Sequence, residues 1–79
     1  MSSGTELSLY RQVAAAIRAG IRGGDLPAGA LLPSEKALAE MHEVGRDTIR
    51  DAMALLRSEG LIESKRGYRS RVSEAGARS

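Results

Sequence analysis

The stretch SEKALAEMHEVGRDTIRDAMALLRSEG, residues 34–60, carries two helical patterns that only three residues separate. The first pattern covers 35–42, and Ser34 is its expected N-cap because a hydroxyl there accepts a hydrogen bond from a free backbone N–H group. Its apolar side chains are predicted to share one face: Leu38 and Met41, flanked by Ala37. The link 43–45 is so short that the chain must turn sharply between two helices.

The second pattern follows Gly45 and predicts a helix that ends at Gly60, the expected left-handed cap. Four apolar residues at helical spacing form its buried stripe: Ile49, Ala52, Met53 and Leu56. Other residues of this helix point away from the stripe: Arg46, Asp47, Arg50, Ala54 and Arg57. One face of the helix is therefore expected in the core and the other in solvent.

Upstream of this stretch, a further helix is predicted from Leu9, with Ser8 as its N-cap. One stripe at helical spacing consists of Leu9, Val13, Ala16, Ile17 and Gly20, with Ile21 beside it. The helix is expected to stop at 23–25, where the sequence reads Gly-Gly-Asp. Segment 26–33 contains two prolines and a glycine, so we expect a turn-rich connector with room for a short strand at Leu31–Leu32.

Downstream of Gly60 the period changes from helical to strand-like. Two short strands are predicted at 61–64 and 69–72, around a turn at 65–68 that contains Gly67. Helix, helix, sharp turn, helix and hairpin is the element order of a winged helix-turn-helix. The predicted fold is therefore mainly α with a small β-hairpin, comprising three helices plus a two-stranded wing.

The chain has 79 residues, enough for one small domain, which we place at 8–72. Segment 1–7 is expected to be disordered, and 73–79 to be a polar tail or linker. Hydrophobic residues make up 42%, but Tyr10 and Tyr68 are the only aromatic ones, so the core must be thin and helical. A domain this small often depends on a partner, which makes a dimer a reasonable expectation.

Composition disfavours several functional classes. The chain has no cysteine and one histidine, so we expect no enzyme, no metal site and no cofactor. It has neither an apolar run of about 18 residues nor a signal-peptide pattern, so we expect a cytoplasmic protein without a membrane partner. The net charge is +2, yet from Val44 onward eight basic residues stand against five acidic ones. Basicity is concentrated in the second half.

The first turn of the helix after Gly45 carries the groups that a major groove requires: Arg46, Asp47, Thr48 and Arg50. An arginine can bind guanine or a phosphate, threonine can contact either, and aspartate can accept from cytosine or hold an arginine. The alternative is an exposed helix face on which Asp47 pairs with its neighbours.

The hairpin tip carries four cations within seven residues and no acidic group: Lys65, Arg66, Arg69 and Arg71. Gly67 lets the backbone approach a partner closely, and Tyr68 is placed to contact a sugar or phosphate. Such a tip suits a phosphate ridge or a minor groove. The alternative is a solvated charge run that blunts an exposed strand edge.

Three further residues allow two interpretations each. Lys36 lies where a cation is unfavourable to the helix dipole, which suggests a phosphate contact, although an ordinary surface lysine fits as well. His42 has no partners for catalysis or metal binding, so we favour a surface or boundary histidine over a ligand. Tyr10 is expected in the core or in dimer packing.

At five separated places the chain resembles the amino-terminal domain of GntR-family transcription regulators. The matching motifs are LYRQV at 9–13, LPAG at 26–29, LPSEK at 32–36, TIRDA at 48–52 and LLRSEGLI at 55–62. By position, the resemblance implies these DNA contacts: Lys36, Arg46, Thr48, Arg50, Arg66 and Gly67.

The chain departs from the family pattern at four of its basic or capping positions. Lys36 stands where the family commonly has arginine, so a bidentate contact becomes a point charge. Gly45 stands where serine or threonine usually caps the recognition helix and touches phosphate; glycine still caps but brings no hydroxyl. Arg69 replaces a usual second glycine and Arg71 a usual aromatic residue, so we expect the wing to depend more on charge.

The resemblance implies a homodimer that binds a short inverted-repeat operator in double-stranded DNA, usually as a repressor, in the cytoplasm at the nucleoid. It also implies an effector-sensing domain after 73–79, so the chain is either an excised domain or a short regulator. The motif spacing resembles the HutC-like branch. The rival function is a winged-helix protein-interaction module whose basic wing docks an acidic partner. Salt dependence of duplex binding distinguishes the two.

Overall fold

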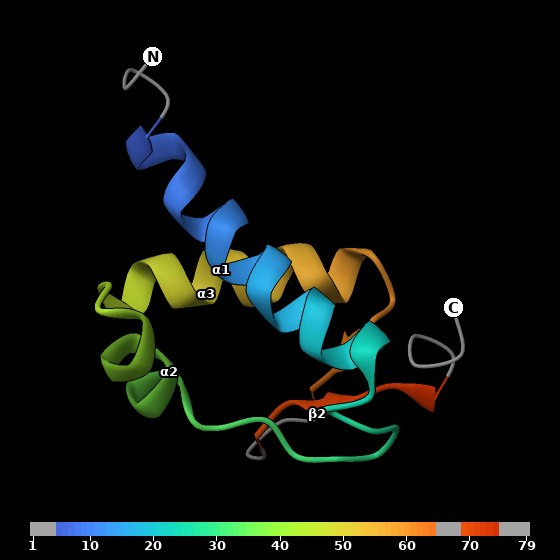
Figure 1. Ribbon diagram of the computed structural model, residues 1–79. Coiled ribbons are helices and arrows are strands. Elements are labelled where there is room, and N and C mark those ends of the chain that lie inside the picture. Colours follow the sequence, from blue (N-terminus) through green and yellow to red (C-terminus); the bar gives the residue numbers. More distant parts are fainter. Residues whose placement is uncertain (1–4, 65–68, 75–79) are drawn as a thin grey trace.

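The computed structural model describes residues 5–64 and 69–74, which form three helices and a two-stranded antiparallel sheet. These elements are α1 (Thr5–Gly23), α2 (Glu35–His42), α3 (Arg46–Ser58), β1 (Ile62–Glu63) and β2 (Arg71–Val72). Figure 1 shows α1 crossing α3, with α2 beside the first turns of α3. The predicted mainly α architecture with a small β-hairpin is confirmed. Within these residues no helix is both long and apolar enough to cross a membrane.

α1 is longer than its sequence pattern predicts. It begins at Thr5 and so includes part of the segment 1–7 that was expected to be disordered. Ser8 consequently lies inside the helix, and its predicted role as the N-cap is wrong. Glu6 and Leu7 are good helix formers, and no glycine or proline stands between Thr5 and Ser8, so the helix continues past the predicted start. It ends at Gly23, as predicted.

The buried faces of α1 and α2 are rotated from the predicted ones. Ala14 and Ala39 are buried, whereas Ala16 and Met41 face solvent, with Met41 66% exposed. In each helix the alanine directly after the first buried apolar residue packs inward, because its small side chain lets the helices approach closely. Successive side chains are about 100° apart around a helix, so the apolar residue three positions after the first buried one points away from the core. This residue is Ala16 in α1 and Met41 in α2.

The core gathers hydrophobic side chains from all parts of the described chain. α3 contributes the four residues that its spacing predicts: Ile49, Ala52, Met53 and Leu56. α1 supplies Val13, Ala14, Ile17 and Ile21, while Leu32, Leu38, Leu61, Ile62 and Val72 close the core from the connector, α2 and the sheet. No polar or charged side chain is buried among the described residues. Hydrophobic burial is therefore the main determinant of how the helices pack.

A third segment, from the connector before α2, pairs with the sheet along β2. β1 and β2 pair antiparallel, with Ile62 opposite Val72. On the other side of β2, Leu31 forms a bridge with Arg71, and the Leu32 N–H donates to the Ser70 carbonyl at 2.8 Å. The short strand expected at Leu31–Leu32 is thus present as a single bridge. This pairing attaches the base of the wing to the connector ahead of α2.

The folded domain extends slightly past its predicted end. The Ser73 N–H donates to the Leu61 carbonyl at 3.0 Å, and the Ser73 hydroxyl donates to the Gly60 carbonyl at 2.5 Å. Ser73 was assigned to the polar tail 73–79, but these hydrogen bonds attach it to the residues that follow α3. The reason is that antiparallel pairing of the strands brings it back beside the start of β1.

The starts of α2 and α3 have different caps. Ser34 caps α2 as predicted, since its Oγ accepts from the Ala37 N–H at 3.1 Å. Gly45 occupies the equivalent position before α3, with extended backbone and no side-chain hydrogen bond to the cap. A Cβ added at Gly45 would meet no heavy atom within 4 Å, so the position has room for a side chain.

Both helices of the helix-turn-helix end in the same hydrogen-bonded motif. After α2, the Val44 N–H donates to the Ala39 carbonyl at 3.0 Å and the Glu43 N–H to the Glu40 carbonyl at 3.3 Å. This is the Schellman arrangement, which needs a left-handed residue at its centre. Glu43 takes that conformation with φ 58°, although its side chain disfavours it. The sharp turn predicted at 43–45 is built around this residue.

After α3 the motif has glycine at its centre. The Leu61 N–H donates to the Leu56 carbonyl at 3.1 Å, and the Gly60 N–H donates to the Arg57 carbonyl at 2.9 Å. Gly60 has φ 77°, so the predicted left-handed cap is confirmed. Leu56 and Leu61 are both buried, which adds the hydrophobic contact that commonly accompanies this motif.

A bidentate ion pair joins α1 to the end of α3. Arg18 Nε and Nη2 donate to the two carboxylate oxygens of Glu59 at 2.9 and 2.8 Å. These residues are 41 positions apart in sequence. The fork geometry and the partial burial of both groups make this pair stronger than a single-contact surface pair.

The two turn residues give a matched test of backbone strain. We expect Gly60→Ala to lower the free energy of unfolding by about 1–2 kcal/mol, because alanine disfavours positive φ. A Cβ at Gly60 meets no heavy atom of the surrounding fold within 4 Å, so the loss comes from the local backbone conformation and not from a clash with other elements. Glu43→Gly should raise the free energy of unfolding by roughly 0.5 kcal/mol. Urea unfolding measures both, and a Glu43→Gly variant less stable than the parent would contradict this account.

Candidate nucleic-acid interface

The burial of one side of α3 determines what its other side presents. Arg46, Asp47 and Arg50 are exposed in its first turn and a half, and Thr48 is half-buried. Arg57 continues the exposed side, because positions 46, 50 and 57 are spaced by four and seven residues and so share one helix face. The N-terminal part of this face lies next to α2.

Carboxylates hold the Arg50 guanidinium from two sides. Arg50 Nε lies 3.4 Å from Glu35 Oε1, and Arg50 Nη1 lies 3.6 Å from Asp47 Oδ1. Glu35 comes from the first turn of α2 and Asp47 from the first turn of α3. The Asp47–Arg50 contact agrees with both predictions for Asp47, which were to hold an arginine in position or to pair with a neighbour on an exposed helix face. The long distances and exposed side chains make both pairs weak enough to exchange for another anion.

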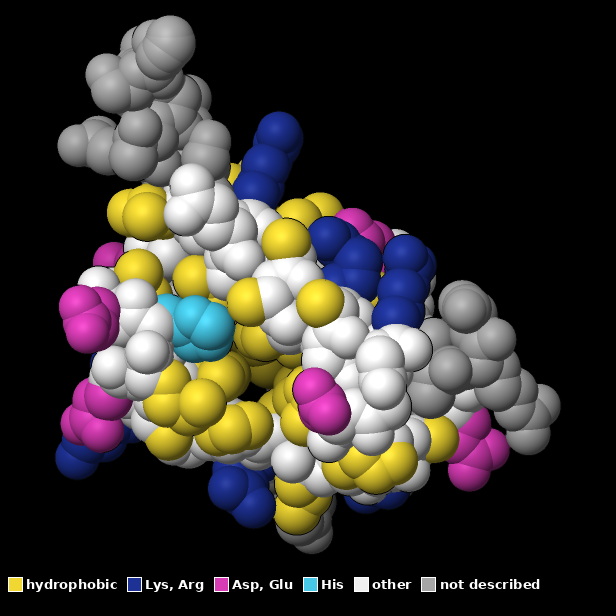
Figure 2. Space-filling model, in the orientation of Figure 1, with side chains coloured by type: hydrophobic (Ala, Val, Ile, Leu, Met, Phe, Trp, Pro, Cys, Tyr) yellow, Lys and Arg dark blue, Asp and Glu magenta, His cyan; other side chains and the backbone are white. Residues whose placement is uncertain are grey.

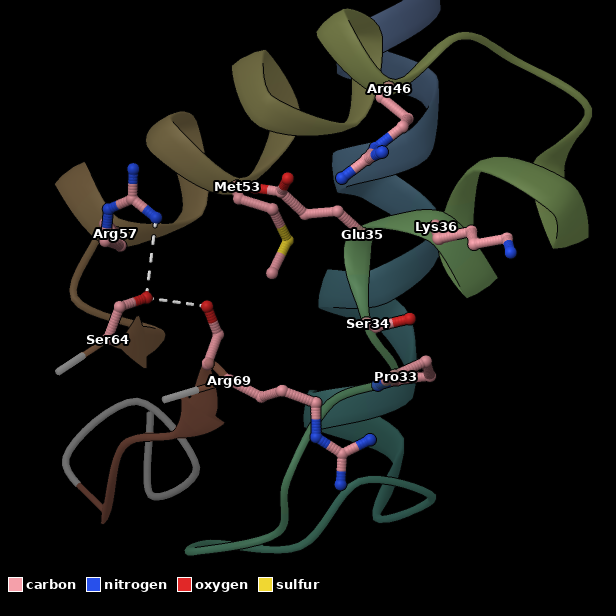
Figure 3. Close-up of a pocket in the computed structure, with 10 residues that line it drawn as sticks. Pro33, Ser34, Glu35, Lys36, Arg46, Met53, Arg57, Ser64 and Arg69 are labelled. Carbon is pink, nitrogen blue, oxygen red and sulfur yellow. Dashed lines mark hydrogen bonds between the residues drawn. The ribbon is translucent and has the colours of Figure 1, made fainter. Parts of the chain in front are cut away.

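A groove lies between the start of α2, α3 and the base of the wing (Figure 3). Its volume is about 470 Å³. Four cationic side chains line it: Lys36, Arg46, Arg57 and Arg69. Three hydroxyl groups line it as well: Ser34, Ser64 and Ser70. Among the described residues, the only carboxylate in its lining is Glu35, which is paired with Arg50, so this part of the groove presents cations and neutral donors to an anionic partner.

A chain of polar contacts connects α3 to the residue that follows β1 and to the residue that precedes β2. Arg57 Nη1 donates to Ser64 Oγ at 3.5 Å, and Ser64 Oγ lies 2.6 Å from Ser70 Oγ, where either hydroxyl can donate. Figure 3 shows this chain at one edge of the groove, with the Met53 side chain pointing into the space between Arg57 and Glu35. The wing base therefore lies close to the last turn of α3.

The structure brings together part of the predicted set of contact residues. Lys36, Arg46 and Arg69 line one groove although they come from α2, α3 and the segment before β2. Gly45, Asp47, Thr48 and Arg50 lie at the start of α3 beside them. The remaining predicted residues lie outside the described part of the chain: Arg66, Gly67 and Tyr68. Arg71, a further wing cation, is exposed on β2.

The opposite side of the domain has a different character. On the face shown in Figure 2, Lys and Arg side chains lie around the rim, and hydrophobic side chains surround a central hollow.

Tyr10 packs against the core from α1, which agrees with its expected core role, and lines a shallow hollow with Asp51, Ala54 and Leu55. His42 is half-buried at the end of α2, as expected of a boundary histidine.

Sequence reasoning missed Glu35, Ser64 and Ser70 as parts of this site, and it gave Arg57 no role. Glu35 entered the sequence analysis only as the first residue of the predicted helix 35–42, and its contact with Arg50 spans 15 residues. The available signal for Arg57 was its place on the polar face of α3 in register with Arg46 and Arg50. Nothing in the sequence pairs Ser64 with Ser70 until the strand register is known.

Comparison with known proteins identifies the family of this chain. The family model described as bacterial regulatory proteins, gntR family, matches residues 9–72. The chain is 43% identical over 61 residues to an uncharacterized HTH-type transcriptional regulator, RB1450, of Rhizobium meliloti, covering 77% of this chain and 25% of that protein. It is 42% identical over 57 residues to the HTH-type transcriptional repressor NanR of Klebsiella aerogenes, covering 72% and 22%. The chain thus spans about a quarter of the length of these relatives.

A solved structure of a related protein includes DNA. The DNA-binding domain of AraR in complex with operator ORX1 superposes with a TM-score of 0.80 at 34% sequence identity, covering 82% of this chain and 78% of that chain. The chain therefore belongs to the GntR family of bacterial regulatory proteins and forms its winged helix-turn-helix DNA-binding domain.

Proposed function

We propose that this domain recognises a specific double-stranded DNA sequence, with α3 in the major groove, as part of a transcriptional repressor. The proposal rests on one observation: the first turn of α3 and the cationic groove lie on the same face of the domain. Arg46 belongs to both, since it begins α3 and lines the groove beside Lys36 and Arg69. Base-reading donors and phosphate-binding cations must lie on one face for a protein to dock on duplex DNA.

Each predicted contact residue receives a role under this proposal. Arg46 and Arg50 read base edges, and Thr48 contacts a base or phosphate next to them. Asp47 accepts from a cytosine amine or keeps Arg50 in position. Lys36 binds a phosphate at the start of α2, where free backbone N–H groups also attract anions.

The remaining contacts follow the backbone. Gly45 caps α3 beside a phosphate without a hydroxyl of its own, so that only backbone N–H groups contact the phosphate there, and Arg69 contacts a phosphate from the wing. The family resemblance assigns Arg66 and Gly67 to the same wing contact, and we assign Tyr68 to a sugar or phosphate. These three residues enter the proposal from the sequence alone.

We further propose that the domain acts as a homodimer on an inverted-repeat operator, since two-fold symmetric sites match dimeric helix-turn-helix proteins. Repression is supported by the relative NanR, which is named a repressor. In this proposal the protein acts at the nucleoid in the cytoplasm without enzymatic activity or cofactor. Residues beyond Ser73 act as a linker to an effector-sensing domain.

We keep the HutC-like branch as a prediction from motif spacing. The matched relatives, which include NanR and GgaR, do not single out that branch.

The first experiment is selection of bound duplexes from a randomised library, followed by binding assays with the selected sequence. We expect Arg46→Ala and Arg50→Ala each to weaken that site by about 1–3 kcal/mol and to relax base preference at one position. Arg22→Ala, exposed at the end of α1, is the matched control. If both variants keep affinity and preference, α3 does not read DNA. Binding to acidic protein without duplex binding would favour the interaction-module alternative.

Glu35 provides a second prediction, because its carboxylate lies in the groove and holds Arg50 at 3.4 Å. We expect Glu35→Gln to strengthen binding to arbitrary duplex by about 1 kcal/mol, because it removes a charge that repels phosphate and frees Arg50. Selectivity for the selected sequence should fall. Glu40→Gln, exposed on the same helix, makes the same charge change outside the groove. Equal gains in both variants would show a net-charge effect only.

Gly45 provides a third prediction, because the added side chain has room and a favourable backbone conformation. We expect Gly45→Ser to strengthen binding to all duplex sequences by about 1 kcal/mol through a hydroxyl contact to phosphate. Gly45→Ala is the control, since it fills the same space without a hydroxyl. Fluorescence anisotropy with selected and arbitrary duplexes measures both variants. An identical affinity for the serine and alanine variants would contradict the phosphate contact.

A further inference from the structure

Arg57 is the one exposed arginine on the DNA-facing side of α3 to which neither the family resemblance nor the proposed function gives a role. We propose that Arg57, together with the Ser64 and Ser70 hydroxyls, forms a second binding site for the DNA backbone at the wing end of the groove. The site would bind a phosphate of the strand that passes between α3 and the wing. This inference rests on the proposed function and adds a contact to it.

The position of Arg57 along α3 favours a phosphate over a base. It lies eleven residues after Arg46, which places it about 16 Å further along the helix axis on the same face. Recognition helices contact base edges with their N-terminal residues, and in homeodomains the C-terminal end of the helix contacts the backbone. With Arg46 at base edges, Arg57 therefore lies where the helix leaves the major groove and meets the backbone.

The charge of Arg57 is not balanced within the described part of the chain. Its one hydrogen bond there is to the neutral Ser64 hydroxyl, at the long distance of 3.5 Å. Arg18 and Arg50, by contrast, each face a carboxylate. Glu59 is two residues from Arg57, but both of its carboxylate oxygens already accept hydrogen bonds from Arg18. Arg57 is thus a lining cation that can accept an anion without first losing an ion pair.

The two hydroxyls complete the donor set. Ser64 Oγ accepts from Arg57 and can donate to Ser70 Oγ at 2.6 Å, which leaves the Ser70 proton free to donate outward. A hydrogen-bond chain that starts at a cation and ends at a free donor fits an acceptor with several oxygens, such as a phosphate. Both serines line the groove with Arg57, so all three groups can reach one anion.

The test measures binding to a short duplex of arbitrary sequence, and to a selected operator, over a range of NaCl concentrations. We expect Arg57→Ala to weaken binding to both by roughly fivefold and to reduce the slope of log K against log salt by about 0.9, the value for one phosphate contact. The ratio between operator and arbitrary duplex should stay unchanged. Arg57→Lys should keep the slope. Arg22→Ala should leave both affinities and the slope unchanged.

Two variants separate phosphate binding from positioning of the wing. Ser64→Ala removes the acceptor for Arg57 but keeps the charge, so we expect a small loss of affinity and an unchanged slope. A loss with Ser64→Ala as large as with Arg57→Ala would overturn the inference, because Arg57 would then act by holding the wing. A change in base preference with Arg57→Ala would overturn it as well.

Failure of this inference is distinguishable from failure of the proposed function. If the unaltered chain binds the operator selectively and Arg57→Ala keeps both its affinity and its slope, only the second backbone site is wrong. If the unaltered chain shows no salt-dependent binding to any duplex, the proposed function itself is wrong and this inference falls with it.

Discussion

The structure depends on the burial of one face of α3 against α1, α2 and the sheet. Ile49 and Leu56 are fully buried there, and no polar side chain accompanies them into the core of the described chain. Rotation of α3 about its axis would expose these residues at about 1.5–3 kcal/mol each, so its orientation is fixed. The same constraint fixes which side chains face outward, and thereby places Arg46, Arg50 and Arg57 on one side.

Within that outward face the arginines differ in their surroundings. Arg50 lies between two carboxylates, so an incoming anion has to replace existing pairs. A group held in this way favours a partner of defined geometry over any nearby phosphate. Arg57 faces neutral hydroxyls and has no such competition. The end of α3 near α2 is thus suited to selective contacts, and the end near the wing to contacts that every duplex offers.

Much of the fold was predictable from the sequence because its signals are local. The period of α3, the Ser34 cap and the Gly60 turn each depend on a few neighbouring residues, and all three are present. Predictions were wrong where packing decides. Ala14 and not Ala16 is buried, and Met41 is exposed, because the partner helix determines where the buried arc is centred.

The sequence by itself determined the element order, the family and most of the cations that contact DNA in the proposal. Hydrophobic period and turn chemistry act over a few residues, so they can be read directly along the chain. Only the tertiary structure decided which groups meet. The Glu35–Arg50 pair spans 15 residues and the Arg18–Glu59 pair spans 41, and Ser64 meets Ser70 through strand register. Such contacts follow from the packing of helices and strands, which no local pattern encodes.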